Sequence, residues 1–133
     1  MVYRFISANW KALIFTCLVL YASISQMDKV DSPGIFNFSH ADKIVHFFMY
    51  LVLSLSWLGG MLKFYYRRKK KVKLYLVGIL VFIYGVLMEV LQFCLSTGRS
   101  AEFADIMANT LGILSAFVLF KWIKKQQWIY RLL

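Results

Sequence analysis

Residues 85–112 read GVLMEVLQFCLSTGRSAEFADIMANTLG, and this stretch decides what kind of fold the chain adopts. It begins as an apolar segment, breaks at the turn-forming residues 96–99 (STGR), and continues as a second apolar segment. Three of the chain's six acidic residues lie in it: Glu89, Glu102 and Asp105. An ionisable residue in a segment apolar enough for lipid is costly and indicates a functional site. The stretch therefore predicts two membrane helices joined by a short turn, with acids that face protein.

Composition extends this interpretation to the whole chain. The 133 residues are 61% hydrophobic, whereas soluble domains are about 45–50% apolar. A single proline and little low-complexity sequence argue against disorder. In lipid, backbone polar groups must be satisfied within the segment itself. We therefore predict one all-α domain over residues 1–133, a polytopic membrane helix bundle.

Four segments are apolar and long enough to cross a bilayer. They cover residues 10–27, 42–62, 72–95 and 102–123, and a basic loop occupies residues 63–73. The first segment also has features of a signal peptide, because Lys11 precedes the apolar run and Ser23-Ile24-Ser25 loosely matches a small-residue cleavage site. Both interpretations give this segment the same orientation.

The distribution of basic residues predicts the topology. Of the 16 lysines and arginines, 13 lie near the N-terminus, in loop 63–73 or in the tail, and three (Lys29, Lys43 and Arg99) lie on the opposite side. By the positive-inside rule, both termini and the basic loop are cytoplasmic, in a multi-pass protein of the plasma membrane. All six acidic residues then belong to the extracytoplasmic half.

The same distribution bears on partners. We expect the bilayer to surround the helices and anionic inner-leaflet lipids to contact loop 63–73. A net charge of +10 would otherwise suggest nucleic acid. Nothing in the loop offers base-specific geometry, so no nucleic-acid partner is expected.

Two cysteines, Cys17 and Cys94, fall in apolar segments without metal-ligand spacing. We interpret them as small buried apolar residues and not as a disulfide or a zinc site.

Polar and small residues recur at helical spacing in three of the four segments. The stripes are Asp42, His46, Tyr50 and Ser54, with Lys43 beside them; Gly85, Glu89, Gln92 and Ser96; and Glu102, Asp105, Asn109, Gly112 and Ala116. The second and fourth segments enter the membrane from the side on which the third leaves it. The three stripes should therefore meet in one leaflet, near the outer headgroup boundary.

These stripes supply the candidate site residues. His46, Glu89 and Asp105 are the candidates for acid–base catalysis, and the candidates for ligand binding are Asp42, Lys43, Tyr50, Gln92, Arg99 and Asn109. Buried acids need partners, so we expect Arg99 or Lys43 to pair with Glu89 or Asp105.

Simpler roles remain open for several of these residues. Asp42 with Ser39 forms a capping-box pattern, and Glu102 is an acid suited to a first helical turn. Gln92 and Asn109 suit interhelical hydrogen bonds, and Gly85 and Gly112 suit close helix packing. No cofactor is assigned, although His46, Glu89 and Asp105 could together hold a divalent metal.

The same residues carry a resemblance to a known family. The sequence DKIVH at 42–46 with Tyr50, EVLQ at 89–92, and RSAEFADIMAN at 99–109 with Gly112 resemble the VanZ-like family over about residues 40–120. The resemblance implies a small bacterial polytopic membrane protein of the cell envelope. It also implies a role in low-level resistance to the glycopeptide teicoplanin, without implying a mechanism.

Three classes of function follow. The polar stripes could bind an outer-leaflet lipid headgroup, a lipid-linked wall precursor or a lipoglycopeptide, with Arg99 and Lys43 as a positive clamp. They could instead form a membrane-embedded acid–base or metal-assisted enzyme, although no GxSxG, HExxH or P-loop pattern is present. They could also only hold together a structural or regulatory membrane protein. The sequence leaves the oligomeric state open.

Overall fold

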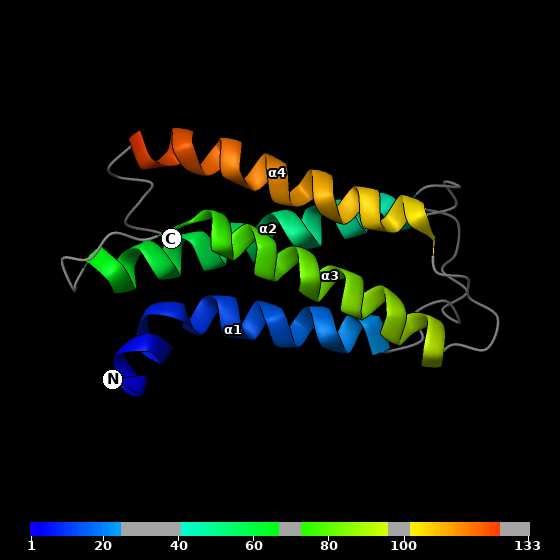
Figure 1. Ribbon diagram of the computed structural model, residues 1–133, viewed down its shortest axis with the longest axis horizontal. Helices are drawn as coiled ribbons and strands as arrows, with labels where there is room; N and C mark the ends of the chain where they lie inside the picture. Colours follow the sequence, from blue (N-terminus) through cyan, green and yellow to red (C-terminus); the bar gives the residue numbers. More distant parts are fainter. Residues whose placement is uncertain (25–40, 67–72, 96–101, 126–133) are drawn as a thin grey trace.

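The computed structural model describes residues 1–24, 41–66, 73–95 and 102–125, which form four long helices. These are α1 (Val2–Ile24), α2 (Ala41–Tyr66), α3 (Tyr75–Leu95) and α4 (Phe103–Lys125). Figure 1 shows that successive helices run in opposite directions along one long axis. None of the described residues forms a strand. The predicted all-α fold with four membrane helices is therefore confirmed.

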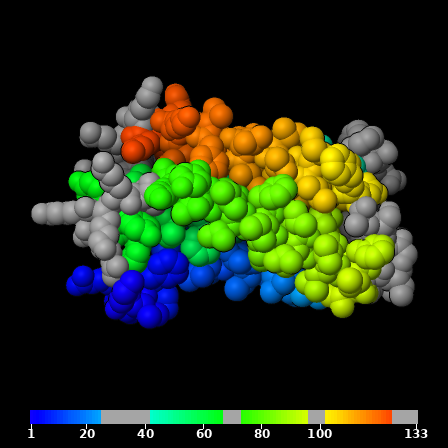
Figure 2. All heavy atoms as spheres, in the orientation of Figure 1, coloured from blue at the N-terminus to red at the C-terminus, as the bar shows by residue number. Residues whose placement is uncertain are grey.

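Each helix is long and apolar enough to cross a membrane. The shortest, α3, has 21 residues, or about 31 Å at 1.5 Å per residue, close to the thickness of a bilayer's hydrocarbon core. The helices form an elongated bundle (Figure 2). Many large apolar side chains are exposed on it, for example Leu80 at 63% and Val118 at 69% exposure. So much apolar surface would drive aggregation in water, whereas in a bilayer it faces lipid. The chain is a multi-pass membrane protein.

At the end of the bundle where α1 begins and α2 ends, the helix boundaries differ from the predicted spans. Helix α1 begins at Val2 and not near residue 10, and α2 continues to Tyr66 and not to residue 62. Phe64, Tyr65 and Tyr66 are therefore helical, whereas the sequence predicts a basic loop over residues 63–73. Residues 67–72 of that loop are outside the part of the chain that the structure describes. A helix satisfies its own backbone hydrogen bonds, so it does not have to end at the hydrocarbon boundary.

Helix α2 is the centre of the bundle and packs against the other three helices. Its closest approach is to α4, at Gly112, where a Cβ atom would collide with the backbone carbonyl of Phe47. On α3, a Cβ at Gly85 would lie 3.0 Å from the ring of Tyr50. Both glycines allow close helix packing, as their positions in the stripes predicted.

The two cysteines are free, as predicted, but both are exposed. The prediction that they are buried was wrong. A thiol is apolar enough to face lipid, so a cysteine in an apolar segment does not have to point into the bundle.

Candidate functional site

Four buried polar side chains meet at the end of the bundle where α2 and α4 begin and α3 ends. We call them the polar cluster: His46 from α2, Glu89 from α3, and Asp105 and Asn109 from α4. Their exposed fractions are 9%, 3%, 4% and 2%, respectively. The helical spacing of the stripes turns these residues inward, because the opposite face of each helix is apolar and exposed.

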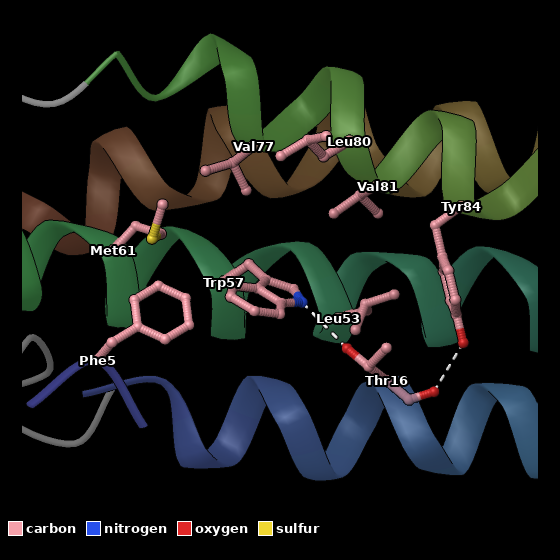
Figure 3. A pocket seen from close by; sticks show the side chains of 9 residues that line it. All are labelled: Phe5, Thr16, Leu53, Trp57, Met61, Val77, Leu80, Val81 and Tyr84. Carbon is pink, nitrogen blue, oxygen red and sulfur yellow. Dashed lines mark hydrogen bonds between the residues drawn. The ribbon is translucent and has the colours of Figure 1, made fainter. Parts of the chain in front are cut away.

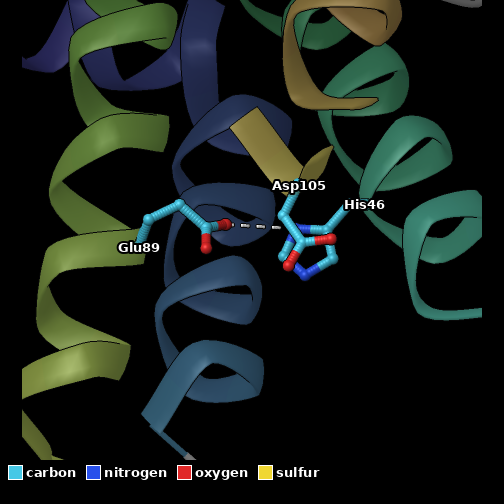
Figure 4. Close-up of side chains that lie close together, drawn as sticks. All are labelled: His46, Glu89 and Asp105. Carbon is cyan, nitrogen blue, oxygen red and sulfur yellow. Dashed lines mark ion pairs between the residues drawn. The ribbon is translucent and has the colours of Figure 1, made fainter. Parts of the chain in front are cut away.

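The polar cluster is joined by direct contacts between three helices. His46 Nδ1 lies 3.1 Å from Asn109 Oδ1 and 3.5 Å from Glu89 Oε1. Asn109 Nδ2 donates a hydrogen bond of 3.4 Å to the same Glu89 oxygen. Figure 4 shows His46, Glu89 and Asp105 pointing toward one another from their separate helices. Asn109 thus holds the imidazole and the carboxylate in place from a third helix.

A more exposed ionic layer lies above the polar cluster, centred on Lys43. Its Nζ lies 2.7 Å from Glu102 Oε2, 3.2 Å from Asp42 Oδ2 and 3.5 Å from Asp105 Oδ1. Asp42 Oδ1 also accepts a hydrogen bond of 2.9 Å from the backbone N–H of Lys43. Asp42 and Glu102 therefore do more than cap the beginning of their helices, because both also form ion pairs with Lys43.

These contacts bear on the predicted ion pairs. The pair between Lys43 and Asp105 is present. Glu89 instead lies beside His46 and Asn109, and Arg99 lies outside the described residues. Because three carboxylates already contact Lys43, its ammonium is not an open clamp for an anionic ligand.

Further polar groups lie along the same stripes. Tyr50 and Ser54 lie deeper on α2, whereas Gln92 lies nearer the end of α3, and all three are buried. The hydroxyl groups of Tyr50 and Ser54 make no hydrogen bond among the described residues, and neither does Asp105 Oδ1. Buried polar atoms are nearly always hydrogen-bonded to protein or water, so each of these atoms has capacity for a further polar partner.

Two groups of side chains have the geometry to hold a metal ion. His46, Glu89 and Asp105 each offer one ligand atom, and these atoms lie within 4.8 Å of one another. Asp42, Glu102 and Asp105 form a second group with the same spacing, but Lys43 already serves as its cation.

The sequence interpretation missed a second polar contact, on α1. Trp57 Nε1 donates a 3.1 Å hydrogen bond to Thr16 Oγ1, and the hydroxyl of Tyr84 donates a 2.8 Å bond to the carbonyl of Thr16. These residues line an apolar cavity of about 270 Å³ between α1, α2 and α3 (Figure 3). Asn9, which is 1% exposed, was missed as well. The available signal was the presence of isolated polar residues in the otherwise apolar first segment.

Comparison with known proteins identifies the family. A family model described as VanZ/LLP1 matches residues 2–124. No curated protein and no solved structure matches the chain significantly. Since the match runs from the first turn of α1 to the last turn of α4, the chain belongs to the VanZ/LLP1 family.

Proposed function

We propose that the polar cluster, which lies beneath the Lys43 layer, binds the polar head of an amphiphile in the outer leaflet. The ligand would be an envelope lipid, a lipid-linked wall precursor or a lipoglycopeptide, and binding would contribute to teicoplanin-type resistance. In this proposal the protein lies in the plasma membrane with its termini in the cytoplasm.

One observation carries the proposal: three helices bring His46, Glu89 and Asn109 into mutual contact inside a membrane protein. Burying such groups in an apolar bundle is costly, and a purely structural contact can be made with small apolar residues. The cluster lies within about two turns of the helix ends, and we expect a headgroup to reside at that depth. Asp105 Oδ1 and the Tyr50 hydroxyl leave hydrogen-bonding capacity for a ligand.

Replacing Glu89 with glutamine tests the proposal. Wild type and Glu89→Gln are expressed at matched membrane levels in a glycopeptide-susceptible bacterial host, and teicoplanin susceptibility is measured. The substitution keeps the shape of the side chain but removes its charge, so protection should fall to the level of the empty vector. Size-exclusion chromatography and thermal unfolding of the purified proteins check the fold.

The matched control is Glu102→Gln, which removes a carboxylate whose side chain is 50% exposed at the same end of the bundle. An exposed ion pair contributes at most about 1 kcal/mol, so this variant should still protect. If Glu89→Gln folds and protects as well as wild type, the proposal is wrong. If Glu89→Gln does not fold, Glu89 is structural, and the cluster serves a structural or regulatory membrane protein instead.

A membrane-embedded enzyme is the second candidate. It is favoured by the 3.5 Å distance between His46 Nδ1 and Glu89 Oε1, with Asp105 beside them, because paired acid–base groups of this kind transfer protons. Turnover separates the two candidates. An enzyme converts the bound amphiphile and loses this conversion in His46→Gln, whereas a binding protein converts nothing even as wild type.

A further inference from the structure

The polar end of the bundle has more carboxylates than cations among its described residues. Asp42, Glu102 and Asp105 share the single ammonium group of Lys43. The two most deeply buried carboxylates, Glu89 and Asp105, lie on either side of the His46 imidazole. Buried carboxylates are stable only when they are paired, protonated or bound to a metal. A metal ion is thus one of the partners that buried carboxylates of this kind can take.

The geometry of three side chains suits a small cation. One ligand atom from each of His46, Glu89 and Asp105 lies within 4.8 Å of the others, and His46 Nδ1 is already 3.5 Å from Glu89 Oε1. Ligand atoms that share an ion at metal–ligand distances of about 2.1 Å lie roughly 3 to 3.5 Å from each other. Spacings of at most 4.8 Å reach this value by small side-chain movements, and His46 would ligate through Nε2 while its Nδ1–H donates to Asn109 Oδ1.

A second observation concerns oxygen atoms on or near these residues that make no hydrogen bond. Asp105 Oδ1 is buried and makes no hydrogen bond, although it lies 3.5 Å from Lys43 Nζ. One turn below His46, the hydroxyl of Tyr50 also has no hydrogen-bond partner, and Tyr50 is only 1% exposed. Unsatisfied oxygen atoms near an imidazole and two carboxylates are what a metal with bound water would satisfy.

We propose that His46, Glu89 and Asp105 bind one divalent transition-metal ion, with Asn109 positioning His46 and Glu89. The inference rests on the proposed function, because the ion would be the part of that site which contacts the headgroup. An imidazole nitrogen with two carboxylates suits Zn²⁺ or Mn²⁺ better than Ca²⁺ or Mg²⁺, which prefer oxygen ligands alone. A metal at this position would also make the site attractive to an anionic headgroup, such as a phosphate.

Metal binding to the full-length protein in lipid nanodiscs tests the inference. After treatment with a chelator, Mn²⁺ or Zn²⁺ is titrated calorimetrically. Wild type should bind one equivalent. Glu89→Gln and Asp105→Asn should bind at least about tenfold more weakly, since even outer-shell changes at metal sites have effects of this size. Glu102→Gln, which touches only the Lys43 layer, should change affinity by less than about fivefold.

A spectroscopic measurement makes the test independent of how well the variants fold. The chain has two histidines, His40 and His46. Electron paramagnetic resonance of bound Mn²⁺ should show coupling to a directly coordinated imidazole nitrogen in wild type and in His40→Gln, and should lose it in His46→Gln. The inference is overturned if wild type binds no stoichiometric metal, if bound Mn²⁺ lacks the nitrogen coupling, or if Glu102→Gln weakens binding as much as Glu89→Gln.

Failure of this inference is distinguishable from failure of the proposed function. If wild type binds no metal but Glu89→Gln abolishes teicoplanin protection, the metal is excluded and the binding function stands. If wild type binds metal but Glu89→Gln protects normally, the metal site stands and the resistance function is wrong.

Discussion

At the scale of single residues, Asn109 holds the polar cluster together. Its amide oxygen lies 3.1 Å from His46 Nδ1 on α2, and its amide nitrogen donates a hydrogen bond of 3.4 Å to Glu89 Oε1 on α3. An amide can satisfy two different neighbours at once because it has both donor and acceptor atoms. A buried imidazole and a buried carboxylate are therefore kept in register by one neutral side chain.

Replacing Asn109 with leucine should destabilise the protein by about 1–3 kcal/mol, because two buried polar groups would lose a partner while the volume stays similar. The measurement is reversible unfolding in mixed detergent. Thr110→Val is the matched control, since the Thr110 hydroxyl donates to the Ile106 carbonyl within its own helix, and its free energy of unfolding should change by less than about 0.5 kcal/mol. Equal stability of Asn109→Leu and wild type would show that these contacts contribute nothing.

At the scale of helices, the arrangement depends on how closely α2 approaches α4. Gly112 places the two backbones in contact beside Phe47 and thereby sets the separation at which His46 reaches Asn109. Gly78 on α3 differs, because its nearest neighbour is the end of the Phe117 ring, which can rotate away.

Gly112→Ala should therefore lower the free energy of unfolding by about 1–3 kcal/mol, as overpacking against an immovable backbone does. It should also weaken function, because it would move the residues of the polar cluster apart. Gly78→Ala should be near neutral or stabilising, because alanine favours a helix over glycine by about 1 kcal/mol. Unfolding of both variants in the same detergent provides the comparison. If the two behave alike, close backbone contact at Gly112 does not set the helix separation.

At the scale of the whole molecule, charge is divided between the two ends of the bundle. Glu102 and Asp105 lie at the beginning of α4, whereas Lys121 and Lys124 lie in its last turns. The division accords with the positive-inside rule and with the proposed position of the polar cluster at the outer surface.

Fusions at the C-terminus test this orientation. A green fluorescent protein fused there should fluoresce and an alkaline phosphatase should be inactive, because both report a cytoplasmic end. Replacing the five basic residues 67–71 with glutamine should weaken the preference, since lysines and arginines in short loops determine it. An active phosphatase fusion on the wild-type chain would place the polar cluster on the cytoplasmic side and would contradict the proposed outer-leaflet ligand.

The sequence by itself determined the number and type of helices, and the inward faces of three of them. Hydrophobic length predicts spans, and helical spacing places His46, Glu89 and Asn109 on protein-facing stripes. Both are local properties of the chain. The sequence also anticipated the pairing of Lys43 with Asp105, since a buried acid needs a nearby cation.

Only the tertiary structure decided which groups touch. In the folded protein, Glu89 contacts His46 and Asn109. Lys43 contacts three carboxylates. Cys17 and Cys94 are exposed on the outside of the bundle. The fold also joins Thr16 to Trp57 and Tyr84 across three helices. Such choices depend on the rotation and separation of packed helices. Close contacts such as that of Gly112 with Phe47 set this separation, and no periodicity within one segment encodes it.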